Sequence, residues 1–136
     1  MTRVLMIEEN HALTESVGLQ CLEQGIATRM AAAFCDGVRQ LLETPVSLII
    51  VSSSLVPVSP RELAKHLDTL APGVPVVVHV DAAQTVDEQV RFELEGFRVV
   101  REPFDVHELL VKGETPARRG APSPAAAAAA LEVLCR

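Results

Sequence analysis

Three consecutive serines, Ser52-Ser53-Ser54, follow the continuous apolar run Leu48–Val51 and could supply a nucleophile. A short apolar run of this kind predicts a buried strand of a parallel sheet, and sites in open α/β sheets lie beyond the carboxyl ends of such strands. A serine nucleophile needs a histidine base held by an acid, and His79 and Asp81 fall on a neighbouring predicted strand and loop. Because no Gly-x-Ser-x-Gly elbow is present, polar residues that merely close the strand are favoured over a small α/β hydrolase.

A pair of acids, Glu8-Glu9, follows a second apolar run, Val4–Ile7. Carboxylate oxygens are suitable ligands for Mg²⁺, which also usually requires substrate phosphates. Two solvated acids at the start of a helix are stabilised by the helix dipole, which explains the same pair without a ligand. Ser52 contributes no carboxylate, although Glu102 could, so we expect weak Mg²⁺ binding or none, and no other cofactor.

The elements that must position these residues alternate between strands and helices. Strands are predicted at 4–7, 26–32, 48–51, 76–80 and 97–100, and helices at 11–24, 36–43, 60–71, 84–95 and 105–113. Strict alternation predicts a parallel sheet with right-handed crossovers and helices on both faces. Five such units fit a flavodoxin-like (βα)5 fold of strand order 2-1-3-4-5.

Local signals set the expected helix boundaries. Asn10 predicts the start of the first helix, and Ser59-Pro60-Arg61-Glu62 is a capping box with proline at the first helical position. Asp36 is expected to cap the second helix, which would turn Val38, Leu41 and Leu42 inward.

The chain divides by composition into three parts. Residues 1–113 form the predicted domain, 114–124 are a Pro/Gly/Arg linker, and 125–136 are an alanine-rich segment that can form a helix. A helix this short is marginal alone, so it should dock or fray. We expect it to lengthen the helix that starts at Asp105 or to cover that edge of the sheet.

Composition excludes several classes of function. The net charge of −6 argues against a nucleic-acid surface, and no apolar run approaches the roughly 18 residues of a membrane span. Cys21, Cys35 and Cys135 are odd in number and far apart, with no spacing of a zinc site or disulfide framework. We therefore expect a cytoplasmic protein that binds neither nucleic acid nor membrane.

Several short segments, in order and spacing, resemble the receiver (CheY-like) domain of bacterial response regulators across residues 3–113. The matching segments are 4–10, 48–52, 72–78, Gly96 and 102–104. The resemblance implies an acidic Mg²⁺ pair, an aspartate that accepts phosphate, a Thr or Ser and a Lys that contact the phosphoryl group, and an aromatic residue that reports the state. The corresponding positions here are Glu8 and Glu9, Ser52, Val80 (or Asp81 if the loop slips by one residue), Glu102 and, for the aromatic, about Val99.

Three of these positions depart from the pattern together. An aspartyl acceptor is both nucleophile and metal ligand, whereas Ser52 offers a neutral hydroxyl with a high pKa. Glu102 would repel a phosphoryl dianion that a lysine would attract, and Val80 lacks a hydroxyl. We therefore expect a degenerate receiver, or pseudo-receiver, whose signal is not aspartyl phosphorylation.

Receivers use one face to dimerise or to bind partners, and the resemblance places the corresponding residues on the fourth helix, fifth strand and fifth helix. They are Val86, Val90, Leu94, Val99, Leu109 and Leu110. The apolar pattern alone predicts that most of them are core. The predicted function is a non-enzymatic protein-interaction or homodimerisation module in two-component-type signalling. The alternative is a receiver-like domain that responds to a divalent cation or small ligand at Glu8, Glu9 and Glu102.

Overall fold

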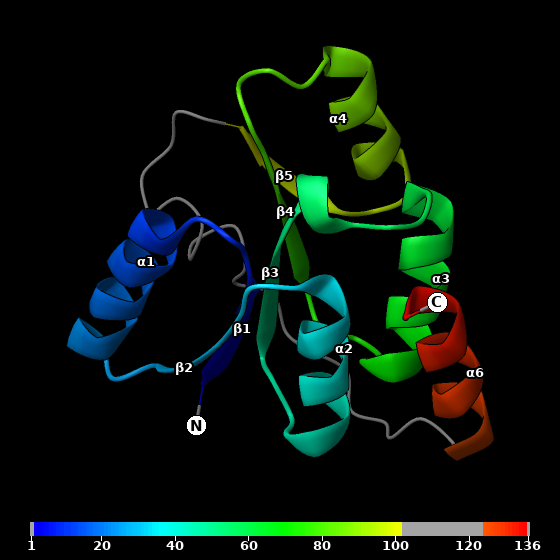
Figure 1. Cartoon of the computed structure of the whole chain (residues 1–136), viewed down its shortest axis with the longest axis horizontal. Coiled ribbons are helices and arrows are strands. Elements are labelled where there is room, and N and C mark those ends of the chain that lie inside the picture. The colour runs from blue at the N-terminus through cyan, green and yellow to red at the C-terminus, as the bar shows by residue number, and fades with distance from the viewer. Residues whose placement is uncertain (1, 102–123, 136) are drawn as a thin grey trace.

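The computed structural model describes residues 2–101 and 124–135 and contains a five-stranded parallel sheet (Figure 1). The strand order is β2-β1-β3-β4-β5, which confirms the predicted order and the flavodoxin-like class. The strands are β1 (Arg3–Ile7), β2 (Ala27–Ala31), β3 (Leu48–Ser52), β4 (Val76–Val80) and β5 (Arg98–Arg101).

Helices cover both faces of this sheet. They are α1 (His11–Glu23), α2 (Phe34–Glu43), α3 (Pro60–Leu70), α4 (Val86–Leu94) and α6 (Pro124–Leu134), with a 3-10 turn, η1 (Ser53–Leu55), after β3. Among the described helices, α1 lies on one face and the others lie on the opposite side (Figure 1). None of them is long and apolar enough to cross a membrane.

The central strand β3 is buried along its whole length because both of its faces are covered. Leu48 and Ile50 pack with Val17 of α1 in one core cluster. Ile49 and Val51 belong to the other cluster, with residues of α2 and α3. This alternation fixes which face each residue at the strand ends will occupy.

The N-termini of the helices show which of the predicted capping residues form a side-chain hydrogen bond. Asn10 accepts a hydrogen bond from the Leu13 N–H at 3.3 Å, and Ser59 accepts one from the Glu62 N–H at 3.2 Å, as the sequence predicts. The prediction for α2 is wrong, because α2 begins at Phe34 and its N-cap residue makes no side-chain bond. Burial of the Phe34 ring in the core starts this helix earlier than an Asp36 cap would.

The inward face of α2 also differs from the prediction in one residue. Val38 is buried and Leu41 is partly buried, but Leu42 is exposed. Gly37 lies one turn from Leu41 on the sheet-facing side, and it allows the helix to approach β1 closely.

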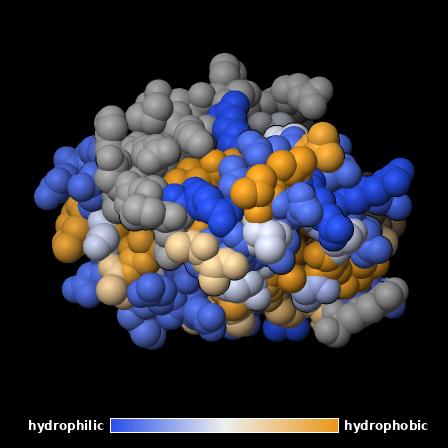
Figure 2. Space-filling view, turned by 90° about the horizontal axis from the view of Figure 1, so that it is seen from above, coloured by the Kyte–Doolittle hydropathy of each residue, from blue (hydrophilic) through white to orange (hydrophobic). Residues whose placement is uncertain are grey.

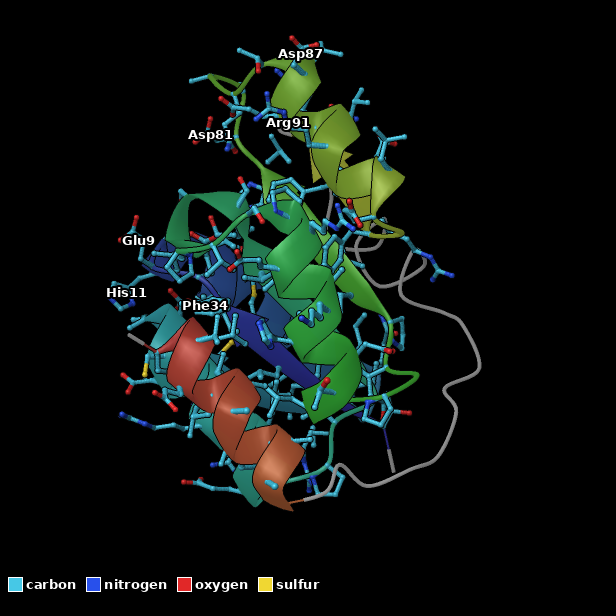
Figure 3. All side chains as sticks on the ribbon, turned by 90° about the vertical axis from the view of Figure 1, so that its right-hand side faces the viewer. Glu9, His11, Phe34, Asp81, Asp87 and Arg91 are labelled. Carbon is cyan, nitrogen blue, oxygen red and sulfur yellow. The ribbon has the colours of Figure 1, made fainter. Side chains whose placement is uncertain are left out.

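The alanine-rich segment forms α6, which packs against α3 and α2 (Figure 3). Its buried residues are Ala127, Ala130 and Leu134, which are spaced to share one face of the helix. The segment therefore docks, as one of the two expected outcomes, and its described partners are α3 and α2. The predicted helix at 105–113 and the linker at 114–123 lie outside the described residues.

Two glycines within the described helices, Gly18 and Gly37, allow a matched comparison of how closely each helix packs on its neighbours. A Cβ on Gly37 would lie 2.5 Å from both Cγ1 and Cδ1 of Ile7, whereas one on Gly18 would meet only Met30 Cε at 3.5 Å. Gly37→Ala should therefore destabilise the fold by about 1–3 kcal/mol, because α2 must move off β1. Gly18→Ala should stabilise it by up to about 1 kcal/mol through helix propensity.

Urea unfolding followed by circular dichroism measures both variants. If Gly37→Ala proved as stable as Gly18→Ala, the close approach of α2 to β1 would be wrong.

Candidate functional site

The candidate site lies where β1, β3 and β4 end, and its residues occupy one row across the sheet. Ile7 of β1 pairs with Val51 of β3, so Glu8 follows beside Ser52, and Ser52 pairs in turn with His79 of β4. All three belong to the same face by the alternation of the strands. Each side chain is only 4–6% exposed.

The centre of the row is a buried bond between its two outer members. His79 Nδ1 lies 3.1 Å from Glu8 Oε2. Neighbouring strands are about 4.8 Å apart, so β1 and β4 are roughly 10 Å apart with β3 between them. The two long side chains meet only because the residue between them, Ser52, is small.

The remaining bonds of Glu8 fix its position. Its other carboxylate oxygen accepts a hydrogen bond from the Asn10 N–H at 3.0 Å, and its own N–H donates to the Ala31 carbonyl at 2.9 Å. When the Glu8 carboxylate is ionised it can only accept, so Nδ1 of His79 then donates in their bond. Glu8 is therefore held in place by α1, β2 and β4 together.

The serines that follow β3 form hydrogen bonds with one another and with Gln84. The hydroxyls of Ser52 and Ser54 are 2.9 Å apart, and the Ser53 hydroxyl donates to Oε1 of Gln84. Ser52 and Ser53 are buried, and Ser54 is exposed. The described hydrogen bond of the Ser52 hydroxyl, the nucleophile of the hydrolase alternative, is therefore with Ser54. His79 hydrogen-bonds Glu8, whereas the hydrolase alternative expects Asp81 as its acidic partner.

The loop between β4 and α4 is held by hydrogen bonds within the loop and by Arg101 of β5. Oε1 of Gln84 also accepts the Asp81 N–H at 3.0 Å, and Asp81 Oδ1 accepts the N–H groups of Ala83 and Gln84 at 2.9 and 3.1 Å. Arg101 of β5 donates to the Gln84 carbonyl and, at 3.3 Å, to Oε1 of Gln89 in α4. Gln84 and Arg101 therefore hold the loop in one arrangement.

The predicted site positions divide into three groups. Glu8 and Ser52 meet in the buried row, whereas Glu9 is exposed beside it (Figure 3). Val80 is fully buried in the apolar core cluster, so it provides no contact at the strand end. Glu102 lies outside the described residues.

The described residues do not fit a divalent cation. Across 2–101 and 124–135, no group of three or more His, Cys, Asp or Glu side chains is gathered as a ligand set. Both oxygens of Glu8 are engaged, by His79 and Asn10, and Ser52 supplies only a hydroxyl.

The sequence prediction missed the site's main partners, Glu8–His79 and Ser53–Gln84. Their members are 71 and 31 residues apart. Strand register was the signal that could have paired Glu8 with His79, because both occupy the position beside Ser52.

The predicted interaction face is partly exposed and partly core. Val86, Val90 and Leu94 of α4 are 66%, 40% and 79% exposed, so the expectation that most of this set is core is wrong for α4. Val99 is buried, and Leu109 and Leu110 lie outside the described residues. The helix turns Phe92 inward instead, where it packs edge-on against Phe97 at a centroid distance of 5.9 Å.

The three exposed residues form an apolar row along α4, which we call the α4 stripe. Figure 2 views the end of the molecule at which α4 lies, and apolar side chains are visible there among charged ones. Asp87 and Arg91 project from the same helix (Figure 3).

Structural comparison identifies the fold as that of response-regulator receiver domains. A response regulator from Burkholderia pseudomallei, solved with a phosphorylated aspartic acid, calcium ion and citrate, has a TM-score of 0.72 at 19% identity, covering 85% of this chain and 68% of that one. A CheY-like receiver domain protein from Methanospirillum hungatei JF-1 has a TM-score of 0.70 at 18% identity, covering 82% and 90%. The beryllofluoride-activated NtrC4 receiver domain dimer has a TM-score of 0.71 at 18% identity, covering 98% and 99%. No family model and no curated protein matches the sequence.

The buried pair makes a prediction about stability. Removing either member breaks a buried hydrogen bond, so Glu8→Ala and His79→Ala should each cost about 1–3 kcal/mol. The double variant should cost less than the sum, with a coupling energy above about 1 kcal/mol in a double-mutant cycle.

The exposed pair Asp36–Arg39, at 4.0 Å, is the control, and its coupling should stay below about 0.5 kcal/mol. Equal coupling in the two cycles would show that Glu8 and His79 do not depend on each other.

Proposed function

We propose that this chain is a pseudo-receiver, a receiver-fold protein that acts without aspartyl phosphorylation as a protein-interaction or self-association module in two-component-type signalling. The observation that carries the proposal is the Glu8–His79 bond that closes over Ser52. A phosphoacceptor must be reachable by a phosphodonor, and this position holds a buried hydroxyl beneath two larger side chains.

The same bonds support a single conformation. A ligand shifts an equilibrium only by interacting differently with two states, and here internal contacts occupy the strand ends. Gln84 and Arg101 fasten the β4–α4 loop without a phosphoryl group. The module is therefore proposed to present its binding surface constitutively.

The proposed binding surface is the α4 stripe. Its three apolar residues lie in one row on a single helix and are exposed, and acidic side chains flank them on the same helix. A second copy of the chain or a protein with a complementary apolar patch would bury this row. We propose a cytoplasmic location and no reaction catalysed by the chain.

The first test is the response to a phosphodonor. After incubation with acetyl phosphate and Mg²⁺, intact-mass spectrometry should show no added phosphate, and light scattering should show one unchanged oligomeric state. A receiver domain that retains its aspartate, treated in parallel, shows that the reagent is active. Stable phosphate on this chain would contradict the proposal.

The second test is a charge placed on the α4 stripe. Leu94→Glu should abolish self-association or partner binding, because a carboxylate would have to be desolvated at the interface. Since the side chain is 79% exposed, stability should change by no more than about 0.5 kcal/mol.

Leu22→Glu on α1 is the matched control, because Leu22 is similarly exposed on the other side of the sheet. Light scattering and pull-down with each variant compare the two surfaces. If Leu22→Glu disrupted association and Leu94→Glu did not, the binding surface would lie on α1.

A further inference from the structure

Two cysteines that are 100 residues apart in the sequence meet at the surface of the fold. Cys35 is in the first turn of α2, and Cys135 follows the last residue of α6. Cys135 Sγ lies 3.8 Å from the Cys35 carbonyl oxygen and donates a weak hydrogen bond to it. Figure 3 shows Phe34, the residue before Cys35, beside the C-terminal end of α6.

The third cysteine is separated from this pair. Cys21 is fully buried on the inward side of α1, in the core cluster on the opposite face of the sheet. Cys35 and Cys135 are both partly exposed, so an oxidant in solvent can reach them. The fold therefore places two accessible thiols together and keeps the third apart.

The surroundings of the pair lower the reactivity of one thiol. Burial, followed by the hydrogen bond and charge of Cys35, raises the pKa of the Cys135 thiol to about 11. Because the thiolate is the nucleophile, attack by Cys135 is slow at neutral pH and becomes faster as the pH rises.

We propose that Cys35 and Cys135 are a redox modification site, whose disulfide fastens α6 to α2. With hydrogen peroxide as the oxidant, the sulfur of one cysteine of the pair attacks one peroxide oxygen, the O–O bond breaks, and a sulfenic acid and one water form. The sulfur of the other cysteine then attacks the sulfenic sulfur, the S–O bond breaks and a second water leaves. Two thiols are oxidised to one disulfide, and one peroxide is reduced to two waters. Such reversible disulfides are the kind found in reducing compartments.

The disulfide would act on the part of the core that α6 completes. Ala127, Ala130 and Leu134 are the fully buried residues of α6, and Leu131 and Cys135 pack against the core partly buried. Two of the three fully buried side chains are single methyl groups, so the helix is expected to open locally before the sheet does. A covalent bond at its C-terminal end would oppose that opening.

The test is oxidation of the reduced full chain with equimolar hydrogen peroxide. The intact mass should fall by two hydrogens, and peptide mapping should join Cys35 to Cys135 with Cys21 still reduced. Amide exchange of Ala127–Leu134 should slow by roughly tenfold or more and recover when a thiol reductant is added.

Two variants and one condition act as controls. Cys21→Ser should oxidise like the natural chain, and Cys35→Ser should form no internal crosslink. In denaturant, Cys21 should join the crosslinks, because the fold no longer selects the pair. Three results would overturn the proposal. They are a disulfide to Cys21 in the native protein, disulfides formed only between chains, or an unchanged rate of amide exchange in α6 after crosslinking.

Discussion

The register that β1, β3 and β4 share is the constraint on which the site depends. Parallel pairing without a bulge places Glu8, Ser52 and His79 in one row, although they come from distant parts of the sequence. Since the outer two side chains are long and the middle one is short, they bond across the central strand. A longer residue in the middle would separate them. The identity of one serine therefore determines whether the strand ends are closed or open.

The strand ends form a filled polar site, with internal bonds where a phosphoacceptor would be. No buried side-chain nitrogen or oxygen among the described residues lacks a hydrogen bond, so the polar groups introduced there are satisfied. Gln84 is central because its amide oxygen accepts from both Ser53 and the Asp81 backbone. The same internal bonds support both parts of the proposed function, the absence of aspartyl phosphorylation and the single conformation.

The sequence predicted the sheet well because each strand is a short apolar run between clear turn signals, and alternation with helices leaves few possible topologies. It also placed Glu8 and Ser52 at the strand ends. It did not predict the Glu8–His79 bond, because that bond depends on register across three strands. The orientation of α4 was missed since Phe92, Val86 and Val90 give the helix apolar residues on more than one side, and only the position of Phe97 selects the buried one.

The packing of α6 has a consequence for the order in which the protein becomes compact during synthesis. Chains emerge from the ribosome from the N-terminus, at about 5–20 residues per second, and domains begin to fold as they appear. All five strands and the helices α1 to α4 are made before α6, yet the core cluster beneath α2 and α3 includes three residues of α6. The sides of α2 and α3 that contact α6 therefore stay uncovered until that helix is made. In that interval the nascent chain presents an apolar surface to chaperones and to other chains.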